Sequence, residues 1–134
     1  EMAQCLGAVR NHLTENGKFL LDIFVPDPEF LYRDPDKKYE EMTIIHPNGG
    51  KCTVWQKNQY KEETEINHIR WSYNRGNIEP MDEYDFDMRM IYPDTMDRVL
   101  SDSDFTIEEK WGDYDGEPFN ETSLLQLYIC SKRS

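Results

Sequence analysis

The fold of this chain is decided by residues 17–28, which read GKFLLDIFVPDP. Apolar side chains fill this stretch from Phe19 to Val25, and only Asp22 interrupts them. A nearly continuous apolar run of this length is typical of a strand buried on both faces, the kind found inside a parallel sheet. The two prolines at its end then prevent further strand pairing. The sequence therefore predicts one buried strand, whereas every later predicted strand alternates between apolar and polar residues.

An amphipathic helix is predicted just before this strand. Its apolar stripe has helical spacing and consists of Met2, Cys5, Leu6, Val9 and Leu13. The helix should end near Asn16-Gly17, because glycine adopts the left-handed C-terminal conformation at little cost. A helix that enters a buried strand through a short turn is the second half of a strand–helix–strand crossover. We expect the first strand of that crossover to lie outside these residues.

After the prolines, the pattern changes to that of antiparallel strands. One helical turn is predicted at Glu29–Arg33, and the hairpin signal Asn48-Gly49-Gly50 lies between the first two strands. The four alternating segments are Glu41–His46, Lys51–Tyr60, Glu65–Tyr73 and Met81–Tyr92. Strict alternation predicts a meander with one apolar face and one polar face.

The end of the chain predicts a helix followed by a β-hairpin. Pro93 opens a short helix over Asp94–Ser101, and strands follow at Phe105–Gly112 and Leu124–Cys130. One face of the first of these strands should carry Phe105, Ile107, Glu109 and Trp111.

The predicted fold class is therefore α+β, and we expect a single domain over residues 1–134. A helix and a buried strand occupy 1–38, an inserted antiparallel sheet 39–92, and a helix with a C-terminal β-hairpin 93–134.

Length and composition restrict the classes of function. The 134 residues are enough for one domain. The net charge of −12, from 27 acidic and 15 basic side chains, makes nucleic acid and anionic membranes poor partners. No run of about 18 apolar residues is present that could span a membrane. Cys5, Cys52 and Cys130 lack CxxC or metal-ligand spacing, which favours reduced thiols in a cytoplasmic protein.

Few residues have the spacing of known catalytic motifs. His12, His46 and His68 have no metal-ligand spacing, so no metal site is predicted. Neither a Gly-x-Ser-x-Gly elbow nor a phosphate-binding Gly-x-Gly-x-x-Gly occurs. Paired carboxylates such as Asp85 and Asp87 fit a solvated strand face better than an acid–base pair in so acidic a chain.

Aromatic side chains are the more informative group. They form 13% of a chain that is only 37% hydrophobic, so they either replace aliphatic residues in the core or line a cavity for a small organic ligand. Both interpretations remain open. The set comprises Trp55, Trp71, Tyr73, Tyr84, Phe86 and Tyr92 on the meander, with Trp111, Tyr114 and Phe119 near the last loop. Arg89 is expected to pair with Asp22, Asp87 or Asp113 rather than to clamp a substrate.

Several stretches resemble class I S-adenosylmethionine-dependent methyltransferases, in particular a bacterial small-molecule subgroup. Gly17–Phe24 is similar to the segment that leads from the fourth helix into the fifth strand of that fold. Further similar stretches are Phe24–Leu31, Arg33–Pro35, Met88–Pro93 and Gly112–Phe119. The likeness runs from Met2 to Cys130 and implies the second half of a Rossmann-like fold. Its last two strands would form a reversed hairpin at one sheet edge, and Tyr39–Tyr92 would be an insertion that covers the active site and selects the acceptor.

The resemblance also implies a cofactor and a reaction. The glycine-rich turn and the acidic residue that hold S-adenosylmethionine belong to the first half of the family's fold, and neither is in these residues. We therefore expect S-adenosylmethionine in the complete enzyme, and no cofactor binding or turnover by this chain alone. The implied reaction is direct methyl transfer to a small molecule, aided by proximity and orientation. The candidate substrate-binding residues are Phe30, Trp55, Trp71, Tyr73, Arg89, Tyr92 and Tyr114.

Two hypotheses of different classes follow. The chain is either the C-terminal, substrate-covering part of such a methyltransferase, or a stand-alone module of the same ancestry that binds a small ligand or self-assembles. In both cases the edge of the Phe19–Val25 strand invites pairing. We expect that edge to pair with a missing N-terminal half or with a second copy in a homo-oligomer.

Overall fold

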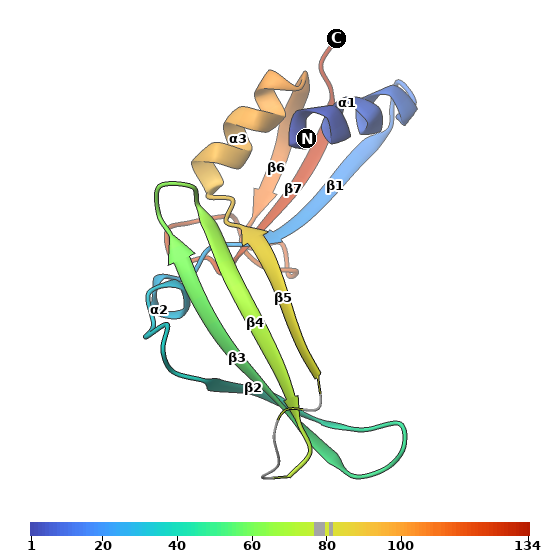
Figure 1. Cartoon of the computed structure of the whole chain (residues 1–134). Helices are drawn as coiled ribbons and strands as arrows, with labels where there is room; N and C mark the ends of the chain where they lie inside the picture. Colours follow the sequence, from blue (N-terminus) through green and yellow to red (C-terminus); the bar gives the residue numbers. More distant parts are fainter. Residues whose placement is uncertain (77–79, 81) are drawn as a thin grey trace. The chain divides into compact units, whose positions relative to one another are not determined.

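The computed structural model describes residues 1–76, 80 and 82–134, which form two compact units. Unit 1 comprises Glu1–Pro26 and Ile91–Ser134, and unit 2 comprises Asp27–Met90. Unit 1 contains α1 (Met2–His12), β1 (Lys18–Phe24), α3 (Pro93–Asp102), β6 (Phe105–Trp111) and β7 (Leu125–Lys132) (Figure 1). Unit 2 contains α2 (Pro28–Leu31), β2 (Tyr39–Ile45), β3 (Lys51–Lys61), β4 (Ile66–Asn74) and β5 (Asp82–Arg89). The predicted α+β class is confirmed, and both sheets are antiparallel.

Unit 1 is a three-stranded sheet with helices on one face. The strand order is β1-β7-β6, so the hairpin of the last two strands lies at the β6 edge. Its core is built from Leu6 of α1, Met96 and Leu100 of α3, and the inward side chains Phe105 and Tyr128. These residues are nearly or fully buried, because both helices cover the same face of the sheet (Figure 1).

The opposite face of this sheet is open, which corrects the prediction for β1. Leu20 is 68% exposed and Phe24 is 47% exposed, whereas a strand buried on both faces would hide them. The register explains the difference: β1 pairs antiparallel with β7, so alternate residues point to the two faces, and the described helices of unit 1 pack on only one of them. The second edge of β1 has no pairing partner among the described residues.

A β-bulge in β6 corrects a second expectation. The register shifts between Ile107 and Glu109, so these two residues lie on opposite faces of the sheet, although they were predicted to share one. Ile107 belongs to the core, but Trp111 lies opposite Leu127 on the open face. The bulge instead brings Lys110 onto the covered face, where its Nζ donates to both carboxylate oxygens of an α3 aspartate, Asp97, at 2.7 and 2.9 Å.

A buried glutamine joins the two places where the chain leaves and re-enters unit 1. Gln126 is fully buried, and its Nε2 donates to the carbonyl oxygens of Phe24 (3.1 Å) and Ile91 (2.8 Å). Its Oε1 lies 3.0 Å from the hydroxyl of Tyr128, which also bonds to Asp97 at 2.8 Å. Asp97 and burial together raise the pKa of Tyr128, so this hydroxyl stays protonated. Phe24 at the end of β1 and Ile91, two residues before α3, are therefore fixed to one side chain.

Unit 2 is the meander that the alternation predicted. Its strand order is β2-β3-β4-β5, and every neighbouring pair is antiparallel. The turn after β2 uses Gly49 and Gly50, both at positive φ, as its hairpin sequence requires. The helical turn α2 begins with Asp27, whose carboxylate accepts the N–H of Glu29. The last strand ends at Arg89 rather than Tyr92, and the predicted start at Met81 lies outside the described residues.

Replacing Gln126 with Met tests how unit 1 is closed. The two side chains have similar volumes, but methionine removes both amide hydrogen bonds to the carbonyl oxygens of Phe24 and Ile91. We expect the free energy of unfolding to fall by about 3 kcal/mol in urea titrations. The matched control is Gln59→Met, at an exposed position of β3, which should change stability little. Equal effects of the two substitutions would contradict the role given to Gln126.

The buried thiol of Cys130 predicts a dependence of stability on high pH. Burial raises the pKa of Cys130 from 9.0 to about 11, so the folded state keeps the thiol protonated while the unfolded chain ionises. The resulting stability is complete below pH 9 and is lost as pH rises toward 11. Between pH 8 and 10.5 the parent should lose about 2 kcal/mol more than Cys130→Ala in urea unfolding. Parallel losses in the two proteins would show that this thiol does not couple to folding.

Candidate functional site

The four-stranded sheet of unit 2 has two faces of opposite character. Residues directly opposite one another in an antiparallel pair share a face, and the register places Trp71 opposite Tyr84, with Phe86 two positions along β5. Tyr73 completes this set, which we call the aromatic face. The other face carries His68, Arg70, Asp85 and Asp87, and we call it the charged face.

A cavity of about 530 Å³ is hollowed in the aromatic face. Its lining residues are Ile44, His46, Cys52, Trp71, Tyr73, Asp82, Tyr84 and Phe86. Trp71 stands edge-on to Phe86 with ring centroids 5.3 Å apart, and Tyr73 stands edge-on to Tyr84 at 5.7 Å. The arrangement favours a small organic ligand, because aromatic rings supply most of the wall and one carboxylate supplies polarity.

The indole of Trp71 is held by a buried side chain of the neighbouring strand, β3. Its Nε1 donates to Oε1 of Gln56 at 2.5 Å, and Gln56 is only 3% exposed. Because the acceptor side chain, Gln56, is buried, the indole plane cannot turn without breaking this hydrogen bond. The largest ring of the cavity is thus oriented before any ligand arrives.

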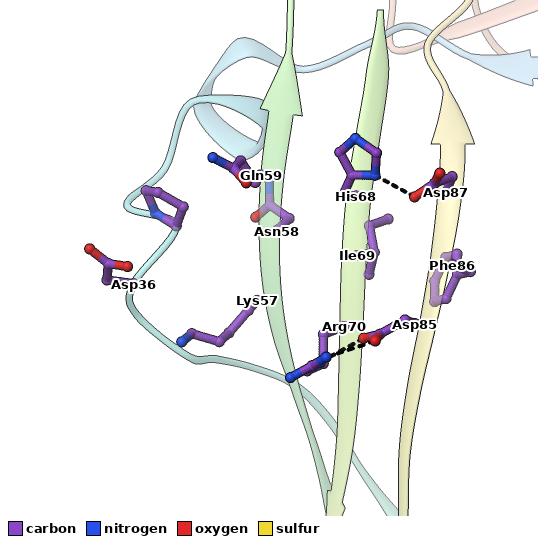
Figure 2. Close-up of a pocket in the computed structure, with 11 residues that line it drawn as sticks. Asp36, Lys57, Asn58, Gln59, His68, Ile69, Arg70, Asp85, Phe86 and Asp87 are labelled. Atoms are coloured by element: carbon purple, nitrogen blue, oxygen red, sulfur yellow. Dashed lines mark hydrogen bonds and ion pairs between the residues drawn. The ribbon is translucent and has the colours of Figure 1, made fainter.

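The charged face bears two cross-strand ion pairs beside a second pocket, of about 430 Å³ (Figure 2). Arg70 makes a bidentate contact with Asp85 at 2.6 and 2.7 Å, and Nδ1 of His68 lies 2.5 Å from the carboxylate of Asp87. The Arg70 pair raises the pKa of the guanidinium and lowers that of the Asp85 carboxyl. These groups are exposed and already paired, so they fit a solvated strand face better than an acid–base site.

The segment after α2 is attached to the sheet by one arginine. The guanidinium carbon of Arg33 lies 4.3 Å from the ring centroid of Phe30 and 4.2 Å from that of Tyr39. Its Nε donates to Oδ1 of Asn58 at 2.5 Å, and its Nη2 donates to Glu41 at 3.0 Å. Arg33 therefore fixes the position of Phe30, which packs in this cluster rather than in the aromatic cavity.

Within unit 2 the predicted substrate-binding residues do not form one site. Trp71 and Tyr73 lie together in the aromatic cavity. Trp55 lies opposite Ser72, on the charged face, because its position on β3 has the other parity. Arg89 ends β5, and its nearest carboxylate is that of Glu65 at 4.0 Å. The β4–β5 register sets Arg89 opposite Ile66, and Arg89 pairs with Glu65 rather than with Asp87, the expected partner that belongs to the same unit.

The two remaining candidates belong to unit 1. Tyr92 is the residue before α3. Tyr114 lies in the loop after β6, where its hydroxyl donates to the carboxylate of Asp22 at 2.6 Å, and this bond raises the pKa of Tyr114. That contact explains the single polar residue in the apolar run of β1, because Asp22 points to the open face and accepts a bond there.

Four lining residues of the aromatic cavity were not predicted from the sequence to bind a ligand: Ile44, His46, Cys52 and Asp82. Ile44 and Cys52 face each other across β2 and β3, and Asp82 lies directly opposite Tyr73. The alternation of each strand was visible in the sequence. What was missing is the register that joins β5 to β4, which the alternation of each strand does not determine.

Metal and membrane sites are not found in the part of the chain that the structure describes. Its His, Cys, Asp and Glu side chains form no cluster of three or more that could hold a metal ion. Its helices are all too short or too polar to cross a membrane. All three cysteines are free, and two of them, Cys52 and Cys130, are buried.

Two solved structures that this chain resembles in fold are methyltransferases. An S-adenosylmethionine-dependent methyltransferase from Clostridium acetobutylicum ATCC 824 superposes with a TM-score of 0.70 over 98% of this chain and 51% of that chain, at 18% identity. The CcbJ methyltransferase from Streptomyces caelestis gives a TM-score of 0.73 over 97% of this chain and 52% of that one, at 12% identity. No family profile and no curated protein sequence matches this chain.

These comparisons establish the fold. The chain has the architecture of part of an S-adenosylmethionine-dependent methyltransferase and spans about half the length of the solved structures that it matches. The resemblance noted in the sequence is therefore confirmed at the level of fold, and the match is consistent with the C-terminal half.

Replacing Arg33 with Lys tests the attachment of the α2 segment. Lysine keeps the charge but loses the planar stack between two rings and the paired donors. We expect unfolding of the chain to become easier by about 2 kcal/mol, measured by calorimetry. The control is Arg70→Lys, which alters an exposed ion pair and should leave the midpoint almost unchanged. A larger effect at position 70 than at 33 would overturn this account.

Proposed function

We propose that this chain is the C-terminal, acceptor-selecting part of an S-adenosylmethionine-dependent methyltransferase that acts on a small molecule. The observation that supports this most strongly is the extent of the structural match: nearly all of this chain superposes on about half of two such enzymes. An inserted sheet with an aromatic cavity is suited to select an organic acceptor.

The open surfaces of unit 1 support the proposal that a further part of the enzyme packs against this unit. The unpaired edge of β1 offers backbone N–H and C=O groups to another strand, and exposed strand edges are avoided in isolated proteins. The open face beside that edge carries Leu20 and Phe24, which are too exposed for a finished core. One further strand with a covering helix, from the N-terminal half of the enzyme, would bury both. A second copy pairing through the same edge is the alternative partner.

The described residues do not fit a complete S-adenosylmethionine site. The glycine-rich turn that commonly binds a nucleoside cofactor needs several closely spaced glycines, which let the backbone approach the ligand. The seven glycines of this chain are isolated, apart from Gly49 and Gly50 in a hairpin turn. When bound in the complete enzyme, S-adenosylmethionine would supply the methyl group. The contribution of this chain would be to orient the acceptor and exclude water.

A second candidate function is a stand-alone module that binds a small ligand. The observation in its favour is that all residues of the aromatic cavity belong to unit 2, so the cavity needs no other part of an enzyme. Such a module would bind its ligand without turnover.

The two functions differ in what S-adenosylmethionine does. We expect the isolated 134-residue chain to give no heat with S-adenosylmethionine in calorimetry. The protein translated from the complete reading frame that contains these residues should bind it and transfer its labelled methyl group to a small-molecule acceptor. A complete protein that does not bind S-adenosylmethionine would exclude the methyltransferase proposal. Tight binding by the isolated chain would refute the claim that a further part is needed.

A further inference from the structure

We propose that the aromatic cavity of unit 2 is a binding site for an organic ammonium group. The cavity consists of residues from unit 2 alone, so the inference does not depend on the methyltransferase proposal. It rests on three properties of the lining: the ring geometry, the fixed indole, and the balance of charge.

The rings provide the attraction that a cation needs. The ring planes of Trp71 and Phe86 are perpendicular, at 90°, and those of Tyr73 and Tyr84 meet at 88°. The rings of each pair therefore lie in two different orientations. Trp71, Tyr73 and Phe86 are partly exposed, Tyr84 is 56% exposed, and all four line the cavity. A cation within about 6 Å of such ring centroids is attracted by their negative faces, most strongly by tryptophan.

The site is preorganised where the attraction is strongest. The buried hydrogen bond to Gln56 fixes the indole of Trp71, so little rotamer freedom is lost when a ligand binds. The ring contact with Phe86 supports the same orientation from the neighbouring strand.

The charged groups of the lining favour a cation over a neutral or anionic ligand. Asp82 lies opposite Tyr73 and forms no ion pair with any described residue, so its carboxylate is available to a ligand. Nδ1 of His46 accepts the backbone N–H of Asn48 at 3.1 Å, so this ring nitrogen is engaged in the hairpin turn. The lining thus holds one carboxylate and neither lysine nor arginine, in a protein of net charge −12.

The size of the cavity agrees with a small cation. Its 530 Å³ lies in the lower part of the range typical of small-molecule sites, about 300–1,000 Å³. An alkylammonium or trimethylammonium group with a short polar substituent would fit, with its charge over the rings and its nearest counter-charge at Asp82.

Choline and 3,3-dimethylbutan-1-ol test this assignment, because they differ mainly in the charge of the central atom. Both are titrated into the 134-residue chain while the indole N–H resonance of Trp71 is followed by NMR. We expect choline to bind about tenfold more tightly than its neutral analogue. Tyr84→Leu, at an exposed ring, should weaken choline binding by about threefold to tenfold without affecting the fold.

A pair of charge-matched variants separates the cavity from the general acidity of the chain. Asp82→Asn and Asp85→Asn each remove one negative charge from β5, but on opposite faces of the sheet. We expect only Asp82→Asn to weaken choline binding, by about fivefold. Equal effects of the two variants, or equal binding of choline and the neutral alcohol, would overturn the proposal.

Two further outcomes are informative. If a second copy of the chain occupies this face, light scattering will show a dimer that Tyr84→Leu dissociates, and choline will not shift the Trp71 resonance; that result also overturns the proposal. Failure of the complete protein to bind S-adenosylmethionine would leave this site standing. Loss of choline binding with methyl transfer intact would remove only the ammonium site.

Discussion

The hydrogen bonds of one amide hold unit 1 together. Gln126 donates to the carbonyl of Phe24, where β1 ends, and to that of Ile91, just before α3 begins. These residues are far apart in the sequence, and all of unit 2 lies between them. β1 can pair with β7, and α3 can pack on the same sheet, only if both chain ends reach this point. The amide is fully buried, so an unmade bond there would cost its full desolvation.

The sequence predicted the elements well because most of them are defined by local signals. Alternation located the strands of unit 2, and a glycine pair located its first hairpin. The errors arose where a non-local contact decides the outcome. The apolar run of β1 is buried on one face only, because the described helices of unit 1 both pack on that face. The bulge at Glu108 has no local sequence signal, because the contact that accompanies it, between Lys110 and Asp97 of α3, is non-local.

The candidate site was only partly predictable for a related reason. Trp55 and Trp71 look equivalent in the sequence, yet they lie on opposite faces because the β3–β4 register pairs Trp55 with Ser72 and Trp71 with Gln56. Asp82 could not be assigned to the cavity until the register of β5 was known. A shift of one residue in either pairing would exchange the aromatic and charged faces. Composition therefore indicated an aromatic site, and only the sheet pairing determined its members.

The hydrogen bonds of Gln126 to Phe24 and Ile91, between which unit 2 lies in the sequence, have a consequence for how such a protein can evolve. Because the exit and the re-entry of the chain are fixed side by side, the entropic cost of closing unit 1 depends on the distance between those ends and hardly on the length of what connects them. The intervening sheet can then be lengthened, shortened or exchanged for another without rebuilding the core of unit 1. Variation in the intervening sheet therefore leaves the junction with unit 1 intact as long as the buried amide of Gln126 is kept.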